Sequence, residues 1–255
     1  MQRAKNQVVL VTGSTKGIGR SIAIEVAKEG GIVVVHGQNE DDGLAVVKEI
    51  EAMSARATFI KADITKPDEC KFLINETVKH FSRIDVLVNN AGITARSDFL
   101  KTDEALFDQV MTTNFKGAYF LSQFAIEHML KQGGGNIVNI ISTNCSVGQS
   151  DLSVFTCSQA AMRTLSKQSA RFYIKQNIRC NSIIAGWVTT PGLINSFSND
   201  STDFEELEKK AREDIPLGNV QTGEDIAAGV LFFIDPESRF VSGTEIDISG
   251  GVGIK

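Results

Sequence analysis

The chain has 255 residues, 42% of them hydrophobic and 22% charged, with a formal net charge of −5. This acidic balance argues against nucleic acid and membrane as partners, because both attract basic surfaces. No apolar run reaches the roughly 18–20 residues that cross a bilayer. The polar N-terminus leads directly into an apolar strand rather than a signal peptide, so we expect a cytoplasmic protein. The four cysteines and three histidines are too dispersed for metal ligation, so we expect reduced thiols and no metal site.

Short apolar, β-branched runs alternate with helical patterns along the whole chain, which is typical of a parallel sheet with crossover helices. We therefore expect residues 1–255 to form a single-domain α/β fold, a Rossmann-type doubly wound parallel sheet of about seven strands flanked by helices. A first helix should end at Gly30-Gly31. The predicted strands are Val8–Val11, Ile32–Val35, Ala57–Ile60, Val86–Val88, Ile137–Ile141, Arg179–Ile184 and Glu245–Ile248.

The first predicted strand runs into the glycine-rich stretch TGSTKGIG, which begins at Thr12. Glycines in such a loop let the backbone turn tightly and approach a pyrophosphate, which then lies at the N-terminus of the following helix. The preceding strand and the following helix supply the context that this motif requires. The predicted dinucleotide-binding residues are Gly13, Ser14, Thr15, Lys16, Gly17, Ile18 and Gly19.

The end of the second predicted strand bears on the choice between NADP and NAD. A site that prefers NAD normally places a carboxylate there to bind the ribose 2′-hydroxyl. Here Gln38 occupies this place, Asn39 is expected to cap the next helix, and the first acid is Glu40. Lys16 in the glycine loop could meet a 2′-phosphate. The sequence therefore favours NADP, with NAD as the alternative.

Further motifs follow in order: Asp63-Ile64 after the third strand, Asn89-Asn90-Ala91-Gly92 after the fourth, Asn114 in a helix and Ile248-Ser249-Gly250-Gly251 near the C-terminus. With the glycine loop they make the chain resemble the short-chain dehydrogenase/reductase family, in its 3-oxoacyl-carrier-protein reductase branch, over nearly its whole length. The resemblance implies NAD(P)-dependent hydride transfer between a carbonyl and a hydroxyl group. It also implies cofactor contacts by Asp63, Ile64, Asn90, Ala91, Gly92, Gly186, Val188 and Thr190, and a catalytic role for Asn114.

In this family a serine, a tyrosine and a lysine perform the reaction, and Ser142 fits the serine. Phe155 stands where the resemblance places the tyrosine, and Gln159 where it places the lysine. A phenol with a pKa of about 10 becomes a usable acid when an ammonium group lowers that pKa. Phe155 has no proton to give and Gln159 has no charge, although Gln159 can still bind a ribose hydroxyl. We expect the reductase chemistry to be atypical or impaired.

Few other residues could replace the missing acid. Asp151 is the best candidate, although a solvated loop residue is the simpler interpretation, and Cys145 and Cys157 are expected to be inert thiols. Tyr119 is expected to face the core. Tyr173 lies 18 residues beyond Phe155, about 27 Å along a continuous helix.

Three functional classes remain open. The first is an oxidoreductase acting on a small molecule through an unusual proton path. The second is a binding protein, either an inactive subunit of an active homologue or a nucleotide sensor. The third is a non-redox enzyme that reuses the pocket. Engineered inactivation would explain Phe155 and Gln159 but not Ala185, where the family has proline.

Two further expectations concern the surface of the molecule. The polar region of residues 191–216 is predicted to form a substrate loop or lid with a short helix pair. The resemblance implies a homodimer or homotetramer. The helices containing Phe107–Leu130 and Phe155–Tyr173 are rich in apolar and small residues, so we predict that they pair between subunits.

Overall fold

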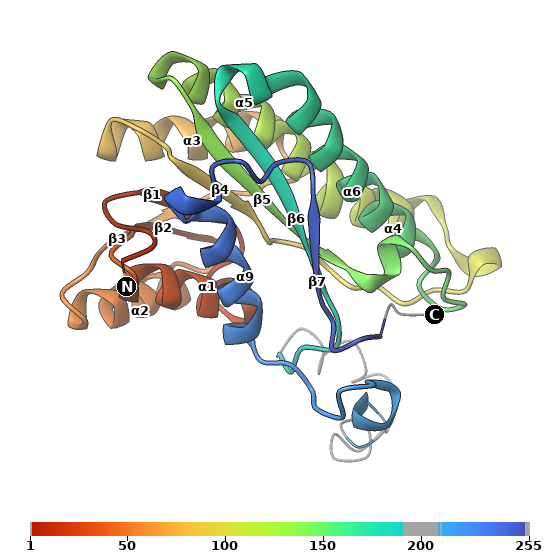
Figure 1. The fold of residues 1–255 in the computed structure, drawn as a ribbon. Helices are drawn as coiled ribbons and strands as arrows, with labels where there is room; N and C mark the ends of the chain where they lie inside the picture. The colour runs from red at the N-terminus through yellow and green to blue at the C-terminus, as the bar shows by residue number, and fades with distance from the viewer. Residues whose placement is uncertain (1, 191–208, 210, 253–255) are drawn as a thin grey trace.

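The computed structural model describes residues 2–190, 209 and 211–252. These residues contain a seven-stranded parallel sheet in the order β3-β2-β1-β4-β5-β6-β7, with helices on both of its faces (Figure 1). The expected fold and all seven predicted strands are confirmed, with ends that differ by no more than two residues. The strands are β1 (Val8–Val11), β2 (Ile32–Gly37), β3 (Arg56–Lys61), β4 (Val86–Asn89), β5 (Gly135–Ser142), β6 (Ile178–Ala185) and β7 (Glu245–Ile248).

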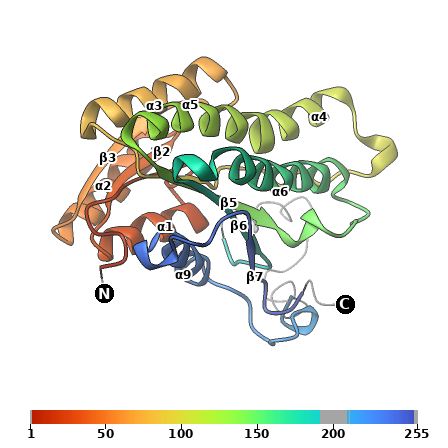
Figure 2. The same cartoon turned by 45° about the horizontal axis from the view of Figure 1, so that its top comes forward.

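The helices form two layers. Helices α1, α2 and α9 cover one face of the sheet, and α3, α5 and α6 cover the other (Figures 1 and 2). The α-helices are α1 (Gly17–Lys28), α2 (Glu40–Ala52), α3 (Pro67–Phe81), α4 (Glu104–Met111), α5 (Gly117–Gln132), α6 (Ser153–Tyr173) and α9 (Gly223–Ile234). Short turns are the 3₁₀ segments Phe99–Lys101, Thr143–Cys145, Ile174–Gln176 and Pro236–Ser238, and a π-helical turn at Thr112–Lys116.

Local sequence signals explain where the first two helices begin and end. Helix α1 ends at Lys28, and Gly30 follows with a φ of +84°, a left-handed conformation that favours glycine. Helix α2 begins after Asn39, whose side chain accepts a hydrogen bond from the backbone N–H of Asp42. The predicted helix stop and the predicted N-cap are both confirmed.

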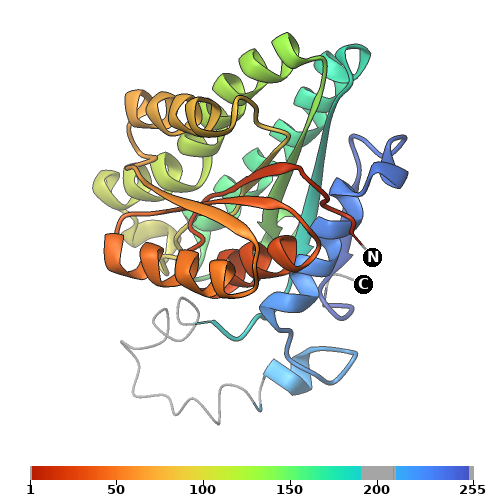
Figure 3. The same ribbon diagram turned by 90° about the vertical axis from the view of Figure 1, so that its left-hand side faces the viewer.

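The core has one large apolar cluster on each face of the sheet. In β1, Val9 and Val11 pack into the cluster beneath α1, α2 and α9, whereas Val8 and Leu10 pack into the cluster beneath α3 and α5. All four residues are buried because helices cover both faces. This explains why the central strands are continuously apolar rather than alternating. Figure 3 shows the twisted sheet between the two layers.

The expected position of Tyr119 is wrong. Its side chain is 46% exposed, because α5 turns Ala118, Leu121 and Ser122 toward the sheet and leaves Tyr119 on the outer side. The expected position of Tyr173 is consistent with the structure, since α6 runs without a break from Ser153 to Tyr173. None of the described helices is both long and apolar enough to cross a membrane. The expected substrate loop lies mostly outside the described residues. Within its range, residues 209 and 211–214 are described as helical.

The order of the strands determines where a ligand can bind. The chain moves outward from β1 to β3, returns to β4 beside β1, and then moves outward in the other direction. The loops that leave the carboxyl ends of β1 and β4 therefore diverge to opposite faces and open a crevice between them. Both the glycine loop and the Asn89–Gly92 motif begin at this crevice.

A buried polar network crosses the middle of the sheet. Asn89 Nδ2 in β4 donates to Asn139 Oδ1 in β5 at 2.8 Å and to Ser122 Oγ in α5 at 3.0 Å. Asn139 Nδ2 donates to Ser166 Oγ in α6 at 2.7 Å, and Ser166 Oγ lies 2.6 Å from Ser182 Oγ in β6. Hydrogen bonds buried this deeply are costly to break, because the groups left behind cannot reach water.

We predict that Asn139→Ala lowers the free energy of unfolding by about 2–4 kcal/mol, because it removes the buried hydrogen bonds to Asn89, Ser166 and Cys180 and leaves partners unsatisfied. Urea denaturation measures this change. The exposed Gln123 on the same layer provides the control, and Gln123→Ala should change stability by less than about 0.5 kcal/mol. Equal stabilities of Asn139→Ala and Gln123→Ala would contradict a stabilising role for the network.

Candidate functional site

The glycine loop is held against the exit of β4. Thr12 Oγ1 accepts hydrogen bonds from the backbone N–H groups of Asn90 and Ala91, at 2.9 and 3.0 Å. Asn90 Nδ2 donates to the carbonyl of Thr12 at 2.8 Å. Gly13 has a φ of +62°, and a Cβ atom there would lie only 3.0 Å from Ala91 Cα. The predicted residues Gly13, Asn90 and Ala91 are thus brought together. Both the positive φ of Gly13 and its close approach to Ala91 favour glycine at this position.

Helix α1 presents an uncapped N-terminus beside this loop. Lys16 precedes the helix without a side-chain capping hydrogen bond, and no acidic residue occupies the first turn. The N–H groups of the first turn of a helix have no partner within it, and they favour an anion. Gly17 begins the helix with a φ of +57°. This arrangement suits a pyrophosphate.

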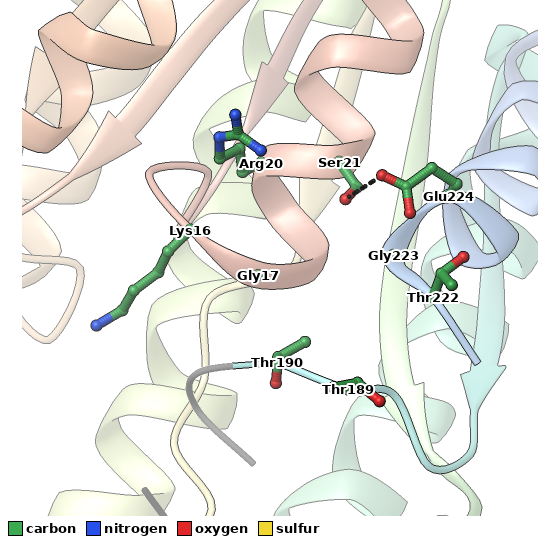
Figure 4. A pocket seen from close by; sticks show the side chains of 9 residues that line it. All are labelled: Lys16, Gly17, Arg20, Ser21, Thr189, Thr190, Thr222, Gly223 and Glu224. Atoms are coloured by element: carbon green, nitrogen blue, oxygen red, sulfur yellow. Dashed lines mark hydrogen bonds between the residues drawn. The ribbon is translucent and has the colours of Figure 1, made fainter. Parts of the chain in front are cut away.

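A cavity of about 410 Å³ opens between the start of α1 and the start of α9. Ser21 Oγ in α1 donates to Glu224 Oε1 in α9 at 3.0 Å. Figure 4 shows these two side chains together at the lining of the cavity, while Lys16 points away from them. The predicted cofactor residues Lys16, Gly17 and Thr190 all line it. The complete lining consists of Lys16, Gly17, Arg20, Ser21, Thr189, Thr190, Thr222, Gly223 and Glu224.

The other side of the glycine loop contacts the end of β2. The backbone N–H of Gly13 donates to His36 Nδ1 at 3.1 Å, and His36 Nε2 lies 3.1 Å from the carbonyl oxygen of Ala62. His36 is only 3% exposed, and burial lowers the pKa of its imidazole from 6.5 to about 4. His36 was not among the predicted cofactor-binding residues, because a lone histidine in an apolar strand carries no motif.

The predicted adenine-side residues lie just beyond Ala62. Asp63 Oδ1 accepts from Thr65 Oγ1 at 2.7 Å and from the Thr65 N–H at 3.1 Å, and Lys66 Nζ lies 3.3 Å from Asp63 Oδ2. The hydrogen bond from the Thr65 hydroxyl is the main reason why the pKa of Asp63 is lowered. Ile64 is buried. Asp63 is therefore held in place as a hydrogen-bond acceptor.

The exit of β2 contains no carboxylate. A Cβ atom at Gly37 would lie 2.5 Å from Thr15 Cγ2, so this strand end packs directly on the glycine loop. The next residue, Gln38, is exposed, as is Lys16 after Thr15. Gln38 and Lys16 therefore flank the same contact. This surface presents an amide and an ammonium group.

Asn114 lies in the π-helical turn between α4 and α5 and is buried. Its side chain accepts from the Ile93 N–H at 2.8 Å and donates to the Ile93 carbonyl at 2.9 Å, which fixes the backbone beyond Gly92. Asn114 Nδ2 also lies 3.1 Å from Ser158 Oγ in α6. The side chain of Asn114 therefore links α6 to the loop after β4.

Ser142, Phe155 and Gln159 lie at the carboxyl end of β5. Phe155 is in the first turn of α6, and Gln159 is one turn later on the same face. Gln159 is buried, and its Oε1 accepts from the backbone N–H of Ser142 at 3.0 Å. Among the described residues, Ser142 Oγ has hydrogen bonds with Asn144 alone, both at 3.3 Å. The structure therefore brings Ser142 and Gln159 together.

Asp151, the best replacement acid in the sequence, forms an ion pair with Arg96, and its carbonyl accepts from the Ser97 N–H at 2.8 Å. None of its described polar contacts joins it to Ser142. An ionised carboxylate in an ion pair accepts hydrogen bonds and cannot donate them. Cys145 is buried and Cys157 is exposed. No cluster of described residues could hold a metal ion.

Gln221 organises the exit of β6, although no sequence motif pointed to it. Gly186 N–H donates to Gln221 Oε1 at 2.9 Å, while Gln221 Nε2 donates to the carbonyl of Ile248 in β7. A Cβ atom at Gly186 would lie 2.9 Å from the backbone Cα of Ser249, so this position favours glycine. Val188 pairs with Gln221 as an isolated bridge, which directs the chain toward Thr190 in the cavity.

We predict that His36 makes the fold sensitive to acid. Because the pKa of His36 is about 4 in the folded state and 6.5 ordinarily, the unfolded chain takes up a proton first as the pH falls. Stability that is fully present above pH 6.5 is then lost toward pH 4, by about 3 kcal/mol. Urea denaturation across this range should show a steeper loss for the wild type than for His36→Gln. Parallel losses would contradict the prediction.

Comparisons with known proteins agree with this fold. Residues 13–253 match the family described as enoyl-(acyl carrier protein) reductase. A protein of Thermotoga maritima described as an uncharacterized oxidoreductase is 36% identical over 247 residues, which cover 97% of both chains. A 3-oxoacyl-[acyl-carrier-protein] reductase of Staphylococcus epidermidis is 34% identical over 248 residues, which cover 97% of this chain and 99% of that one.

Two solved structures extend the agreement to three dimensions. A chain from Burkholderia xenovorans with 30% identity superposes with a TM-score of 0.95 and covers 100% of this chain and 99% of its own. A 7α-hydroxysteroid dehydrogenase in complex with NADH and 7-oxo glycochenodeoxycholic acid has 31% identity and a TM-score of 0.91, and the match covers 98% of this chain and 95% of that one. The chain belongs to the short-chain dehydrogenase/reductase family of oxidoreductases and is a 3-oxoacyl-carrier-protein reductase-like member.

Proposed function

We propose that this protein binds NADP(H), in preference to NAD(H), and transfers hydride between a carbonyl and a hydroxyl group without a tyrosine–lysine pair. The observations that carry the proposal are the dinucleotide cradle, formed by the glycine loop and Asn90 at the ends of β1 and β4, and Gln159 against Ser142 at the end of β5, with Phe155 one turn earlier in α6. The cradle argues for a bound nicotinamide cofactor. The two side chains argue for slow or unusual proton transfer.

The cradle supports cofactor binding through three features that meet at one crevice. They are the two glycines with positive φ in the loop, the uncapped start of α1 and the fixed Asp63 carboxylate. The related 7α-hydroxysteroid dehydrogenase was solved with NADH, which supports the same class of cofactor here. When bound, the cofactor would supply or accept the hydride. The chain's own residues would orient it and exclude water.

The proton on the alkoxide oxygen must come from another source. Ser142 has a hydroxyl that is only weakly engaged by Asn144, so it can hydrogen-bond a substrate oxygen. The proton itself would then come from water or from the substrate. A positioned general acid is worth roughly 10²–10⁴-fold in rate, and this protein would lack that factor.

One observation favours a second candidate function, that of a binding subunit or nucleotide sensor without turnover. Gln159 Oε1 accepts a hydrogen bond from the Ser142 N–H, so this oxygen already has a partner within the protein. Its amide nitrogen can still donate to a ribose hydroxyl. A site with this arrangement can hold a cofactor and position it without chemistry. An active homologue could be the partner of such a subunit.

We predict that Phe155→Tyr/Gln159→Lys raises the rate of carbonyl reduction by roughly 10²–10⁴-fold, because it introduces a phenol and an ammonium that lowers the pKa of that phenol. NADPH consumption and product formation are measured together on a panel of diketones and acyl thioesters. The single variants serve as matched controls. Each lacks one half of the pair and should gain much less.

The wild-type rate decides between the candidates. Slow turnover that the double variant accelerates supports the proposed oxidoreductase. Turnover only in the double variant supports the binding subunit or sensor. Ordinary wild-type turnover that the double variant does not raise contradicts the need for a tyrosine–lysine pair. Product formed without NADPH consumption would instead point to a non-redox enzyme.

We predict that Gln38→Asp weakens NADPH binding by about tenfold and strengthens NADH binding, because a carboxylate repels the 2′-phosphate and accepts from a 2′-hydroxyl. Calorimetric titration with each nucleotide measures both changes. Gln38→Ala is the control, because it removes the amide without adding charge. If the carboxylate leaves the ratio of the two affinities unchanged, Gln38 does not face the 2′ position.

A further inference from the structure

His36 connects two parts of the cradle that are distant in sequence. Its Nδ1 accepts from the Gly13 N–H in the glycine loop, and its Nε2 faces the carbonyl of Ala62, the residue before Asp63. Its backbone joins the same loop, because the His36 carbonyl accepts from the Ser14 N–H at 2.9 Å and the His36 N–H donates to Ser14 Oγ at 3.0 Å. One residue thus touches the pyrophosphate loop and the adenine-side wall.

The partners of the ring fix its tautomer. A backbone N–H can only donate, so the Nδ1 that faces Gly13 carries no proton. A carbonyl can only accept, so the Nε2 that faces Ala62 carries the proton. The imidazole is therefore neutral and has both of its hydrogen-bonding positions satisfied inside the protein. It leaves no free nitrogen for a ligand.

The contacts of Thr12 and Asn90 hold the glycine loop on the β4 side only, so the contact with His36 is needed on the β2 side. Thr12 and Asn90 hold the loop against β4 through the peptides of Thr12 and Gly13. The opposite side of the loop faces the end of β2, where His36 takes the Gly13 N–H and Gly37 leaves room for Thr15. Gly13 also has a left-handed backbone, which glycine adopts without a side chain to restrain it.

We propose that His36 is a positioning residue for dinucleotide binding. By accepting the Gly13 N–H it sets the path of the loop, and with it the direction of the unpaired N–H groups at the start of α1, without touching the nucleotide. This inference rests on the proposed function, because it assumes that the loop binds a dinucleotide. The contact with Ala62 holds the ring but is not the part that sets affinity.

Two conservative variants separate the two contacts. In His36→Asn, the side-chain oxygen can take the place of Nδ1 and accept from Gly13, while the link to Ala62 is lost. In His36→Gln, the terminal amide nitrogen can take the place of Nε2 and donate to Ala62, while the acceptor for Gly13 is lost. Both substituents are polar and smaller than or similar to imidazole, and thermal unfolding checks that each variant folds.

We expect NADPH titration to give wild-type affinity within about twofold for His36→Asn. Affinity should be about three- to tenfold weaker for His36→Gln, the usual range for one neutral hydrogen bond. Hydrogen exchange of the Gly13 amide should follow the same ranking of variants. Exchange should be slow in the wild type and in His36→Asn, and faster in His36→Gln. If His36→Gln retains wild-type affinity, or if both variants lose affinity equally, the inference is overturned.

The exchange measurement keeps this inference distinct from the proposed function. If wild-type protein binds neither NADPH nor NADH, the proposed function fails. Faster Gly13 exchange in His36→Gln than in His36→Asn would still support the role of His36 in setting the loop. Equal exchange in the two variants would overturn it, whatever the nucleotide affinity.

Discussion

The close approach of the glycine loop to the two strands on either side of β1 is the constraint on which the site depends. At Gly13 the backbone lies so near Ala91 that a single added carbon would be 3.0 Å from its Cα atom. At Gly37 an added carbon would be 2.5 Å from Thr15. Such distances leave no room for side chains, so the loop is fixed by backbone and by a few polar groups. Its N–H groups can then be directed at an anion without further rearrangement.

Two kinds of contact hold this loop. On the β4 side Thr12 and Asn90, which belong to the family motifs, hold it by hydrogen bonds. On the β2 side the buried His36 accepts the N–H of Gly13. The contrast matters for energetics. A hydroxyl and an amide remain neutral at any ordinary pH, whereas the His36 imidazole stays neutral below pH 6.5 only because burial lowers its pKa to about 4. The same residue thus links cofactor geometry to acid stability.

The reaction end of the crevice differs in character from the binding end. Ser142 and Gln159 lie together, but the contact between them uses the Ser142 backbone rather than its hydroxyl. Asp151, the best candidate for a replacement proton donor, is held by Arg96 in an ion pair. At this end of the crevice the described contacts of Ser142 and Gln159 are hydrogen bonds within the protein.

Periodicity and local motifs in the sequence determined the strands, the order of the elements and the glycine loop, because each depends on residues that are neighbours along the chain. The N-cap at Asn39 belongs to the same class, and so does the absence of ionisable groups at Phe155 and Gln159. The sequence was a poorer guide to which side chains are buried. The exposure of Tyr119 depends on which face α5 turns to the sheet, and a single residue in the sequence does not indicate that face.

Only the tertiary structure decided which polar groups meet. His36 reaches Gly13 across 23 positions, Gln221 reaches Gly186 across 35, and Arg96 reaches Asp151 across 55. No local pattern encodes such pairs, because they arise when parallel strands bring their carboxyl ends to one edge of the sheet. The sequence therefore specified a dinucleotide cradle, while the packing of the sheet specified how its loop is held and which side chains remain available for chemistry.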